Sequence, residues 1–287
     1  MRLKADLTLF AVAIIWGTAF IAQDVAGQYR VAYLFNAASF LLGALALLPF
    51  LPRRSPQAPL SRSEIGWMSL AGLVLFVAAA LQQIGIFYTQ VANAGFLTSL
   101  YTVITPFLLW WFFREKPHWL DAVAVSGAVA GAYLLSTSGQ GLQFQQGDGL
   151  VFAGALFWAL HFVILGKFAS RYEPVTFSIG QFLVCGLLNL AVGLLTEPLS
   201  ALTALPLLGA IVYRGLMSVG IGYTLQVWGQ NHTPPTDAAL ILGLESVFAA
   251  LAGWLFLQQT LQSIQLIGCA VIFTAVMLSQ LKSRPTE

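Results

Sequence analysis

The sequence predicts an all-α integral membrane protein with ten transmembrane helices, arranged as two inverted repeats of five helices. Three observations lead to this prediction: the composition, the length of the apolar segments, and a match between the two halves of the chain. Of the 287 residues, 58% are hydrophobic and 8% are charged, and the mean hydropathy is +0.81. Because roughly a quarter of the residues in soluble domains are charged, most side chains here must face lipid or other helices.

The apolar segments have the length that a helix needs to cross a bilayer, since about 20 residues span a hydrocarbon core of ~30 Å. Interruptions by Pro, Gly or charged residues divide the first half into predicted helices at 6–23, 32–51, 65–88, 92–113 and 118–137. The second half contains predicted helices at 148–167, 174–196, 206–229, 236–257 and 262–281. Pro106 predicts a kink in the fourth helix, and Pro234 with Pro235 marks the loop before the ninth.

The distribution of basic residues predicts the orientation. Cytoplasmic loops of membrane proteins hold an excess of Lys and Arg. With the N-terminus inside, the inner segments contain eleven of the thirteen basic residues, namely Arg2, Lys4, Arg53, Arg54, Arg62, Arg114, Lys116, Lys167, Arg171, Lys282 and Arg284. Arg30 falls in an outer loop, and Arg214 lies within a span. We therefore expect both termini to be cytoplasmic, in a multi-pass protein of a bacterial-type inner membrane.

An internal repeat relates the two halves. At an offset of 142, six of fifteen positions are identical in the first and sixth helices, including Asp6 with Asp148 and Trp16 with Trp158. A weaker match at an offset of 144 includes Trp110 with Trp254. The predicted repeats are residues 1–141 and 142–287. Since each holds five helices, an odd number, the second must be inverted in the membrane, which is typical of secondary transporters with a midplane substrate site.

Three stretches resemble the EamA domain of the drug/metabolite transporter superfamily. They are Leu244–Leu251 with its continuation to Gly268, Pro174–Gln181, and the pair Arg114–Glu115. The resemblance covers nearly the whole chain as two EamA-like units. It implies ten helices, cytoplasmic ends and the export of amino acids, other metabolites or drugs. Within the superfamily, the chain looks similar to bacterial exporters of neutral and aromatic amino acids, and a multidrug or hydrophobic-cation exporter is the alternative.

Three ionisable residues lie deep inside predicted spans: His161, Arg214 and Glu245. Charges in a bilayer core are costly, so each is a candidate functional residue. The rise per residue places Arg214 and Glu245 within about 5 Å of each other in depth. They could bind the carboxylate and the ammonium of a substrate, or they could form a permanent ion pair between two helices. Glu245 could also exchange protons, and His161 could relay them or be a neutral hydrogen-bonding residue of the core.

Aromatic and amide side chains complete the candidate substrate-binding set. Trp16 and Trp158 are repeat-related and each comes ten residues after the start of its helix, near the midplane. Two central indoles could flank a cavity and bind an amino-acid side chain or a cation, although helix packing would also explain them. Tyr101, the repeat partner of Glu245, and Gln82 with Gln83 are further candidates; weaker ones are Tyr213 and Tyr223.

Other classes of protein lack their expected patterns. A membrane enzyme would need a catalytic cluster, and the sequence contains no HExxH motif, no paired-aspartate motif and no Gly-rich phosphate loop. A channel or receptor is disfavoured by the inverted repeat and the short loops. We predict no cofactor, no metal site, no disulfide and no nucleic-acid partner. The expected partners are a small-molecule substrate and the lipid bilayer, and function does not require an oligomer.

Overall fold

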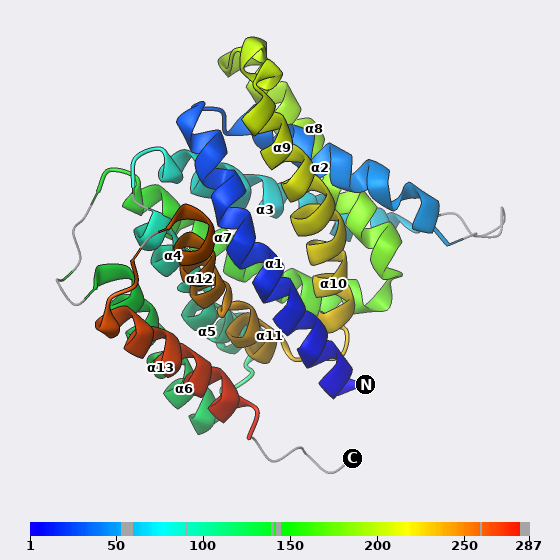
Figure 1. Cartoon of the computed structure of the whole chain (residues 1–287). Helices are drawn as coiled ribbons and strands as arrows, with labels where there is room; N and C mark the ends of the chain where they lie inside the picture. Colours follow the sequence, from blue (N-terminus) through cyan, green and yellow to red (C-terminus); the bar gives the residue numbers. More distant parts are fainter. Residues whose placement is uncertain (53–59, 90, 139–140, 142–144, 259, 282–287) are drawn as a thin grey trace.

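The computed structural model consists of helices joined by short loops (Figure 1). It describes residues 1–52, 60–89, 91–138, 141, 145–258 and 260–281. The first half contains α1 (Arg2–Gln28), α2 (Tyr33–Leu47), α3 (Arg62–Ile86), α4 (Val91–Ser99), α5 (Tyr101–Phe113) and α6 (Trp119–Thr137). The second half contains α7 (Asp148–Phe168), α8 (Pro174–Thr196), α9 (Leu205–Tyr213), a π-helix (Arg214–Tyr223), α10 (Thr224–Gln230), α11 (Pro235–Leu242), α12 (Glu245–Leu257) and α13 (Ser263–Ser279).

These elements form the predicted spans. Within the described residues, nine helical segments are at least 18 residues long and apolar enough to cross a membrane, and the tenth apolar helix, α13, has 17 residues. The all-α architecture of a multi-pass membrane protein is therefore confirmed. The N-terminus and the last described residues lie at one face (Figure 1), which we call the terminal face. The opposite face, where α1, α3 and α6 end, is called the distal face.

Three predicted continuous helices are interrupted. The predicted fourth helix is divided into α4 and α5 at Leu100, and the predicted ninth helix into α11 and α12 at Gly243 and Leu244. The predicted eighth helix contains the π-helix between α9 and α10. Pro106 lies inside α5, so the break at Leu100 comes six residues before the proline. The two breaks occupy equivalent repeat positions, which an apolarity pattern alone does not reveal.

Contacts between the halves follow the same pseudo-twofold relation. Gly85 of α3 lies against Val151 of α7, and the equivalent Gly229 of α10 lies against Leu9 of α1. In each case the missing side chain allows helices from different repeats to approach closely. The two breaks also meet, since Gly243 lies beside Thr102 of α5. The repeats are thus inverted and interlocked, with the broken helices crossing at the centre.

The predicted division of the chain at 141/142 falls in the loop before α7. Of this loop, residues 139–140 and 142–144 lie outside the described part of the structure. The division into residues 1–141 and 142–287 therefore stays a prediction, although the inverted relation of the two sets of helices does not depend on it.

Candidate functional site

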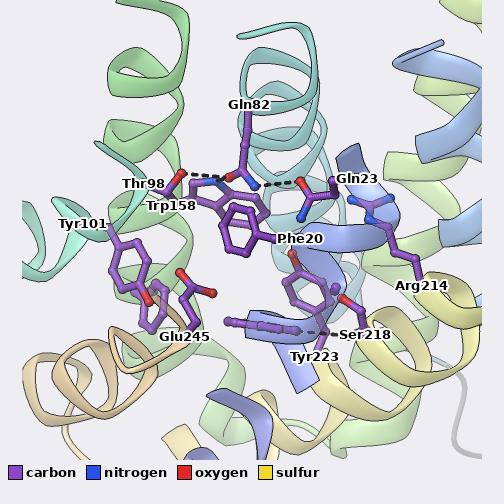
Figure 2. Close-up of a pocket in the computed structure, with 13 residues that line it drawn as sticks. Phe20, Gln23, Gln82, Thr98, Tyr101, Trp158, Arg214, Ser218, Tyr223 and Glu245 are labelled. Carbon is purple, nitrogen blue, oxygen red and sulfur yellow. Dashed lines mark hydrogen bonds between the residues drawn. The ribbon is translucent and has the colours of Figure 1, made fainter. Parts of the chain in front are cut away.

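A cavity lies at the centre of the molecule, between the two repeats (Figure 2). Six of the eight predicted site residues line it: Trp16, Gln82, Tyr101, Trp158, Arg214 and Glu245. The sequence prediction did not include Ala19, Phe20, Gln23, Thr98, Phe162 and Ser218, and it ranked Tyr223 among the weaker candidates, yet all seven line the same cavity. The structure therefore brings together residues from seven helical segments around a single space.

The helix breaks place Tyr101 and Glu245. Tyr101 is the first residue of α5 and Glu245 is the first residue of α12, so both stand where a broken helix resumes. The backbone N–H groups at a helix start favour a carboxylate, which helps to accommodate Glu245 although it is only 5% exposed. The hydroxyl of Ser246 donates to the carbonyl of Gly243 at 2.9 Å and so satisfies a backbone group at the break.

Tyr101 and Glu245 also face each other across the pseudo-twofold axis. The Tyr101 hydroxyl interacts with the Glu245 carboxylate, without the geometry of a full hydrogen bond. The Tyr101 ring stacks on Phe162, with ring centroids 4.8 Å apart and planes at 19°. At this repeat position the first repeat therefore has a phenol, Tyr101, and the second has a carboxylate, Glu245. Only the second repeat contributes a carboxylate to the cavity lining.

Arg214 lies away from Glu245, and Figure 2 shows Phe20 and Tyr223 between them. Its guanidinium carbon is 4.9 Å from the ring centroid of Phe35 and 5.2 Å from that of Phe40. No ion pair joins Arg214 to Glu245, and Nη1 of the buried guanidinium has no hydrogen-bond partner among the residues that the structure describes. The interpretation of these two residues as a permanent ion pair is therefore wrong. Aromatic faces stabilise the cation instead.

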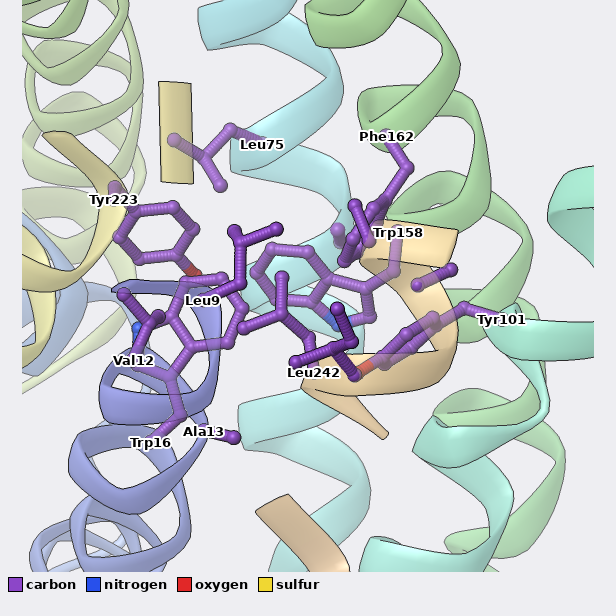
Figure 3. Close-up of a cluster of buried hydrophobic side chains, with 14 of the residues drawn as sticks. Leu9, Val12, Ala13, Trp16, Leu75, Tyr101, Trp158, Phe162, Tyr223 and Leu242 are labelled. Carbon is purple, nitrogen blue, oxygen red and sulfur yellow. The ribbon is translucent and has the colours of Figure 1, made fainter. Parts of the chain in front are cut away.

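Aromatic rings line the cavity beside the two charged groups and form what we call the aromatic wall. The rings of Trp16 and Tyr223 are 4.7 Å apart, and those of Trp158 and Tyr223 are 6.2 Å apart and stacked. Figure 3 shows both indoles and Tyr223 within the central apolar cluster, near Leu9 and Leu242. Each indole N–H has an acceptor: Trp158 donates to Oε1 of Gln82 at 2.6 Å, whereas Trp16 donates to the carbonyl of Ser218 at 3.2 Å.

Gln82 is the centre of a hydrogen-bonded network at the cavity (Figure 2). Besides the Trp158 indole, its Oε1 accepts from Thr98 at 3.4 Å, and its Nε2 donates to Oε1 of Gln23 at 2.9 Å. Gln83 does not line the cavity; its Nε2 donates to the backbone carbonyl of Gln23 at 2.9 Å. The two neighbouring glutamines thus have different positions, one facing the cavity and one bracing α1 against α3.

His161 does not line the cavity either. It is fully buried behind Tyr223, with ring centroids 6.2 Å apart, and its Nε2 is 2.8 Å from Oε1 of Gln181. Tyr213, another of the weaker candidates, is hydrogen-bonded to Thr18 at 2.5 Å. These positions favour the interpretation of His161 as a hydrogen-bonded residue of the core. Among the described residues, no group of three or more His, Cys, Asp and Glu side chains is arranged to hold a metal ion.

The central cavity is small in this conformer, while a larger vestibule lies beside it. The cavity has a volume of about 40 Å³, well below the ~300–1,000 Å³ typical of ligand pockets. The vestibule has a volume of about 440 Å³ and is lined by residues near the distal ends of the helices, including Asp24, Thr89, Ser136, Thr260 and Gln265. Two of the residues that line the vestibule are close in sequence to residues that line the cavity: Phe96 comes two residues before Thr98, and Ser246 directly follows Glu245. Because the vestibule is the larger of these two spaces and lies on the distal side, we assign this conformer to the state open toward the distal face.

Toward the terminal face, polar contacts join the two repeats, and a recess of about 270 Å³, smaller than the vestibule, lies there between α1, α11 and α13. Below Leu9 and Leu242, Arg2 donates to Asp237 at 2.5 Å and Thr233 donates to Asp6 at 2.7 Å. These contacts join the start of α1, in the first repeat, to the start of α11, in the second. A small central cavity, with separate recesses toward each face and no shared lining, suits a carrier better than an open pore.

Comparison with known proteins gives a consistent family. The model of the EamA-like transporter family matches this chain twice, over residues 3–137 and 145–281. An uncharacterized transporter of Archaeoglobus fulgidus is 30% identical over 98% of this chain and 87% of its own length. The threonine/homoserine exporter RhtA of Escherichia coli K12 is 28% identical, over 60% of this chain and 58% of its own length.

The fold also matches a solved structure. One crystal structure superposes with a TM-score of 0.82 over 99% of this chain and 100% of the other, at 19% sequence identity. At this identity the match concerns the fold alone.

Proposed function

We propose that this chain, which belongs to the EamA-like transporter family, exports a neutral or aromatic amino acid by alternating access. Family membership makes it a multi-pass membrane transporter rather than an enzyme. The substrate class and the transport cycle are the proposed part. In the proposed cycle, the substrate occupies the central cavity, and the two repeats open it to one face at a time.

The observation that carries the proposal is the separation of Glu245 and Arg214 within one cavity. Both side chains are 5% exposed, both line the cavity, and they are not paired with each other. A zwitterionic amino acid satisfies both charges at once, with its ammonium at Glu245 and its carboxylate toward Arg214. A simple cation would satisfy Glu245 alone and would leave the guanidinium without an anionic partner.

The aromatic wall fits the remaining part of such a substrate. Trp16, Tyr223 and Trp158 line the same cavity as the two charges, so the side chain of a bound amino acid would contact ring faces. The relative named as a threonine/homoserine exporter supports the same class, because its substrates carry both charges. Since the cavity holds about 40 Å³ in this conformer, binding requires side chains or helices to move apart.

The proposed direction and location follow from the basic residues. Arg2, Arg62 and Lys167 lie near the terminal face, and Lys167 pairs there with Glu115. An excess of Lys and Arg marks cytoplasmic segments, so we place the terminal face in the cytoplasm of a bacterial cell. The vestibule then opens outward. Fusing green fluorescent protein or alkaline phosphatase to the C-terminus tests this, because the former fluoresces only in the cytoplasm and the latter is active only outside it.

The flux test uses three molecules that differ by one charged group. Purified protein is reconstituted into liposomes, and uptake is measured for phenylalanine, for phenethylamine, which lacks the carboxylate, and for 3-phenylpropionate, which lacks the amine. Threonine and methionine extend the panel, and each flux is measured with and without a pH gradient. We expect saturable flux of the amino acids and weak flux of both analogues. Preferential flux of phenethylamine would contradict the amino-acid proposal and favour a hydrophobic-cation exporter.

Single substitutions test separately whether Glu245 binds the ammonium and whether Arg214 binds the carboxylate of the substrate. Glu245→Gln should reduce phenylalanine flux at least tenfold, because loss of one charge-assisted hydrogen bond costs about 1.5–3 kcal/mol. Arg214→Gln should reduce phenylalanine flux and raise the relative flux of phenethylamine. Glu115→Gln is the matched control, since it makes the same change in a side chain that is 49% exposed at the terminal face. Unaltered phenylalanine flux in Glu245→Gln would show that the Glu245 carboxylate does not bind the substrate.

A further inference from the structure

The two central tryptophans are repeat-related, but their hydrogen bonds differ. Trp158 donates to the side chain of Gln82, which lies in α3 of the other repeat. At an offset of 144, the equivalent of Gln82 is Gln226, in α10. If the two halves had the same conformation, Trp16 would donate to Gln226. It donates instead to the backbone carbonyl of Ser218.

Gln226 has no hydrogen-bond partner in the described part of the chain. It is fully buried, and neither its Nε2 nor its Oε1 makes a hydrogen bond to the described residues. Burying an amide without partners is costly, and such groups in a native structure call for an explanation. Gln82, by contrast, has three side-chain partners. The glutamine at this repeat position is thus hydrogen-bonded to three side chains in the first half, whereas in the second half it has no hydrogen-bond partner among the described residues.

The π-helix accounts for this difference. It covers Arg214–Tyr223, and the equivalent stretch, residues 70–79, lies within the continuous α-helix α3. Hydrogen bonds of the i→i+5 type change the register of the residues that follow, and Gln226 comes three residues after the π-helix. Short π-helical segments within α-helices are frequent at functional sites. The π-helix therefore separates Gln226 from Trp16 and presents the carbonyl of Ser218 in its place.

In an inverted-repeat carrier, exchanging the conformations of the two halves converts a state open to one face into a state open to the other. This follows from the pseudo-twofold axis in the membrane plane. We infer that Gln226 is the positioning residue for Trp16 in the conformer open to the terminal face: there the Trp16 indole N–H leaves the Ser218 carbonyl and donates to Gln226, while Trp158 leaves Gln82. The inference rests on the alternating-access part of the proposed function and is independent of the substrate.

Gly222 provides a second, independent sign of this exchange. A Cβ added to Gly222 would lie 2.7 Å from Nε1 of Trp16, so the present position of the indole requires a glycine. The equivalent position in the first repeat is Ala78, beside Gln82 in α3. An alanine is therefore accommodated where the tryptophan donates to the glutamine side chain. Gly222→Ala should displace Trp16 from Ser218 and disfavour the present conformer.

Cysteine accessibility measures the two conformers without any substrate. In a background with Cys185→Ser and Cys269→Ser, Gly95→Cys reports on the distal vestibule, because a side chain there meets no atom within 4 Å. Its repeat equivalent, Ala239→Cys, is fully buried in the present conformer and reports on opening toward the terminal face. The rate of labelling by N-ethylmaleimide is measured at each reporter.

The two glutamines should act in opposite directions. Gln82→Leu removes a bond of the present conformer, so labelling at Gly95→Cys should fall and labelling at Ala239→Cys should rise, each by up to about tenfold, as expected for one buried hydrogen bond. Gln226→Leu removes a bond of the other conformer, so labelling at Ala239→Cys should fall. Gly222→Ala should shift both reporters in the same direction as Gln82→Leu.

If the two glutamines only stabilised the fold, Gln82→Leu and Gln226→Leu would not change the labelling rate at Ala239→Cys in opposite directions. Asn189→Leu is the control, since it removes a buried amide whose hydrogen bond at 2.9 Å stays within its own helix. It should shift neither reporter. Equal shifts for Gln82→Leu and Gln226→Leu, or none for either in protein that elutes as a folded species, would overturn the exchange. Failure of amino-acid flux would leave these labelling results unchanged, so the two proposals fail separately.

Discussion

Thr233 donates a hydrogen bond of 2.7 Å to Asp6 and so joins the second repeat to the first at the terminal face. The equivalent pair at the distal face, Thr89 and Asp148, is hydrogen-bonded in the same way. Each repeat thus begins with an aspartate that is bound by a threonine of the other. Each face has a further contact between the repeats: an ion pair between Arg2 and Asp237 at the terminal face, and a backbone hydrogen bond of 3.2 Å from Gly147 to the carbonyl of Tyr88 at the distal face.

Arg2→Gln should therefore favour opening toward the terminal face. The Asp237 side chain is 2% exposed, and losing one charge-assisted hydrogen bond to such a buried carboxylate costs about 1.5–3 kcal/mol. Labelling at Ala239→Cys should increase several-fold, and Gly95→Cys should label more slowly. Lys4→Gln is the control at the same end of α1. An unchanged labelling rate in Arg2→Gln would show that the ion pair does not hold the face closed.

Tyr101→Phe should weaken substrate binding without destabilising the fold. The hydroxyl adjoins Glu245, so its loss removes a polar neighbour of the carboxylate. The ring remains stacked on Phe162 at 4.8 Å. Since this contact lacks the geometry of a full hydrogen bond, we expect the KM for phenylalanine to rise only about twofold, at the low end of the ~0.5–1.5 kcal/mol of one hydrogen bond. A large drop in the thermal unfolding midpoint in detergent would instead assign the hydroxyl to the stability of the fold.

The sequence predicted the helices and much of the cavity because both follow from simple patterns. Charged and amide side chains within apolar segments are conspicuous, which identified Glu245, Arg214 and Gln82. The repeat match identified Trp16 and Trp158. Whether these residues bind substrate stays a prediction.

Other features depend on backbone geometry that apolarity does not encode. The helix breaks before Tyr101 and Glu245 and the π-helix change which nearby side chains face the centre, so Thr98 and Ser218 were missed. The depth estimate for Arg214 was insufficient to exclude an ion pair, because depth says nothing of the direction in which a side chain points. Only the structure shows that Phe35 and Phe40 hold the guanidinium.

Gln23→Leu should reduce the preference for the present conformer. Gln23 accepts from Nε2 of Gln82 at 2.9 Å, whereas its repeat equivalent is Leu165, which offers Gln226 no such partner. The network around Gln82 is therefore better satisfied than the one proposed for Gln226, and this difference favours opening toward the distal face. In Gln23→Leu, labelling at Gly95→Cys should fall several-fold. Gln28→Leu, which removes an exposed amide at the end of the same helix, should have no effect.

Gly17→Ala tests whether the crossing of α1 and α12 holds Glu245 in place. A Cβ at Gly17 would lie 2.5 Å from Cβ of Phe248 and 2.7 Å from the carbonyl oxygen of Glu245, so the helices would have to separate. Overpacking of this kind costs about 1–3 kcal/mol. We expect a lower thermal unfolding midpoint and reduced phenylalanine flux, because the start of α12 carries the carboxylate.

Gly66→Ala is the matched control, since a Cβ there meets no atom within 4 Å. It should leave both the unfolding midpoint and the flux unchanged. If Gly17→Ala lowered the midpoint while the flux per folded molecule stayed normal, the position of Glu245 would not depend on this crossing. The breaks in the two central helices would then be sufficient to place the carboxylate in the cavity.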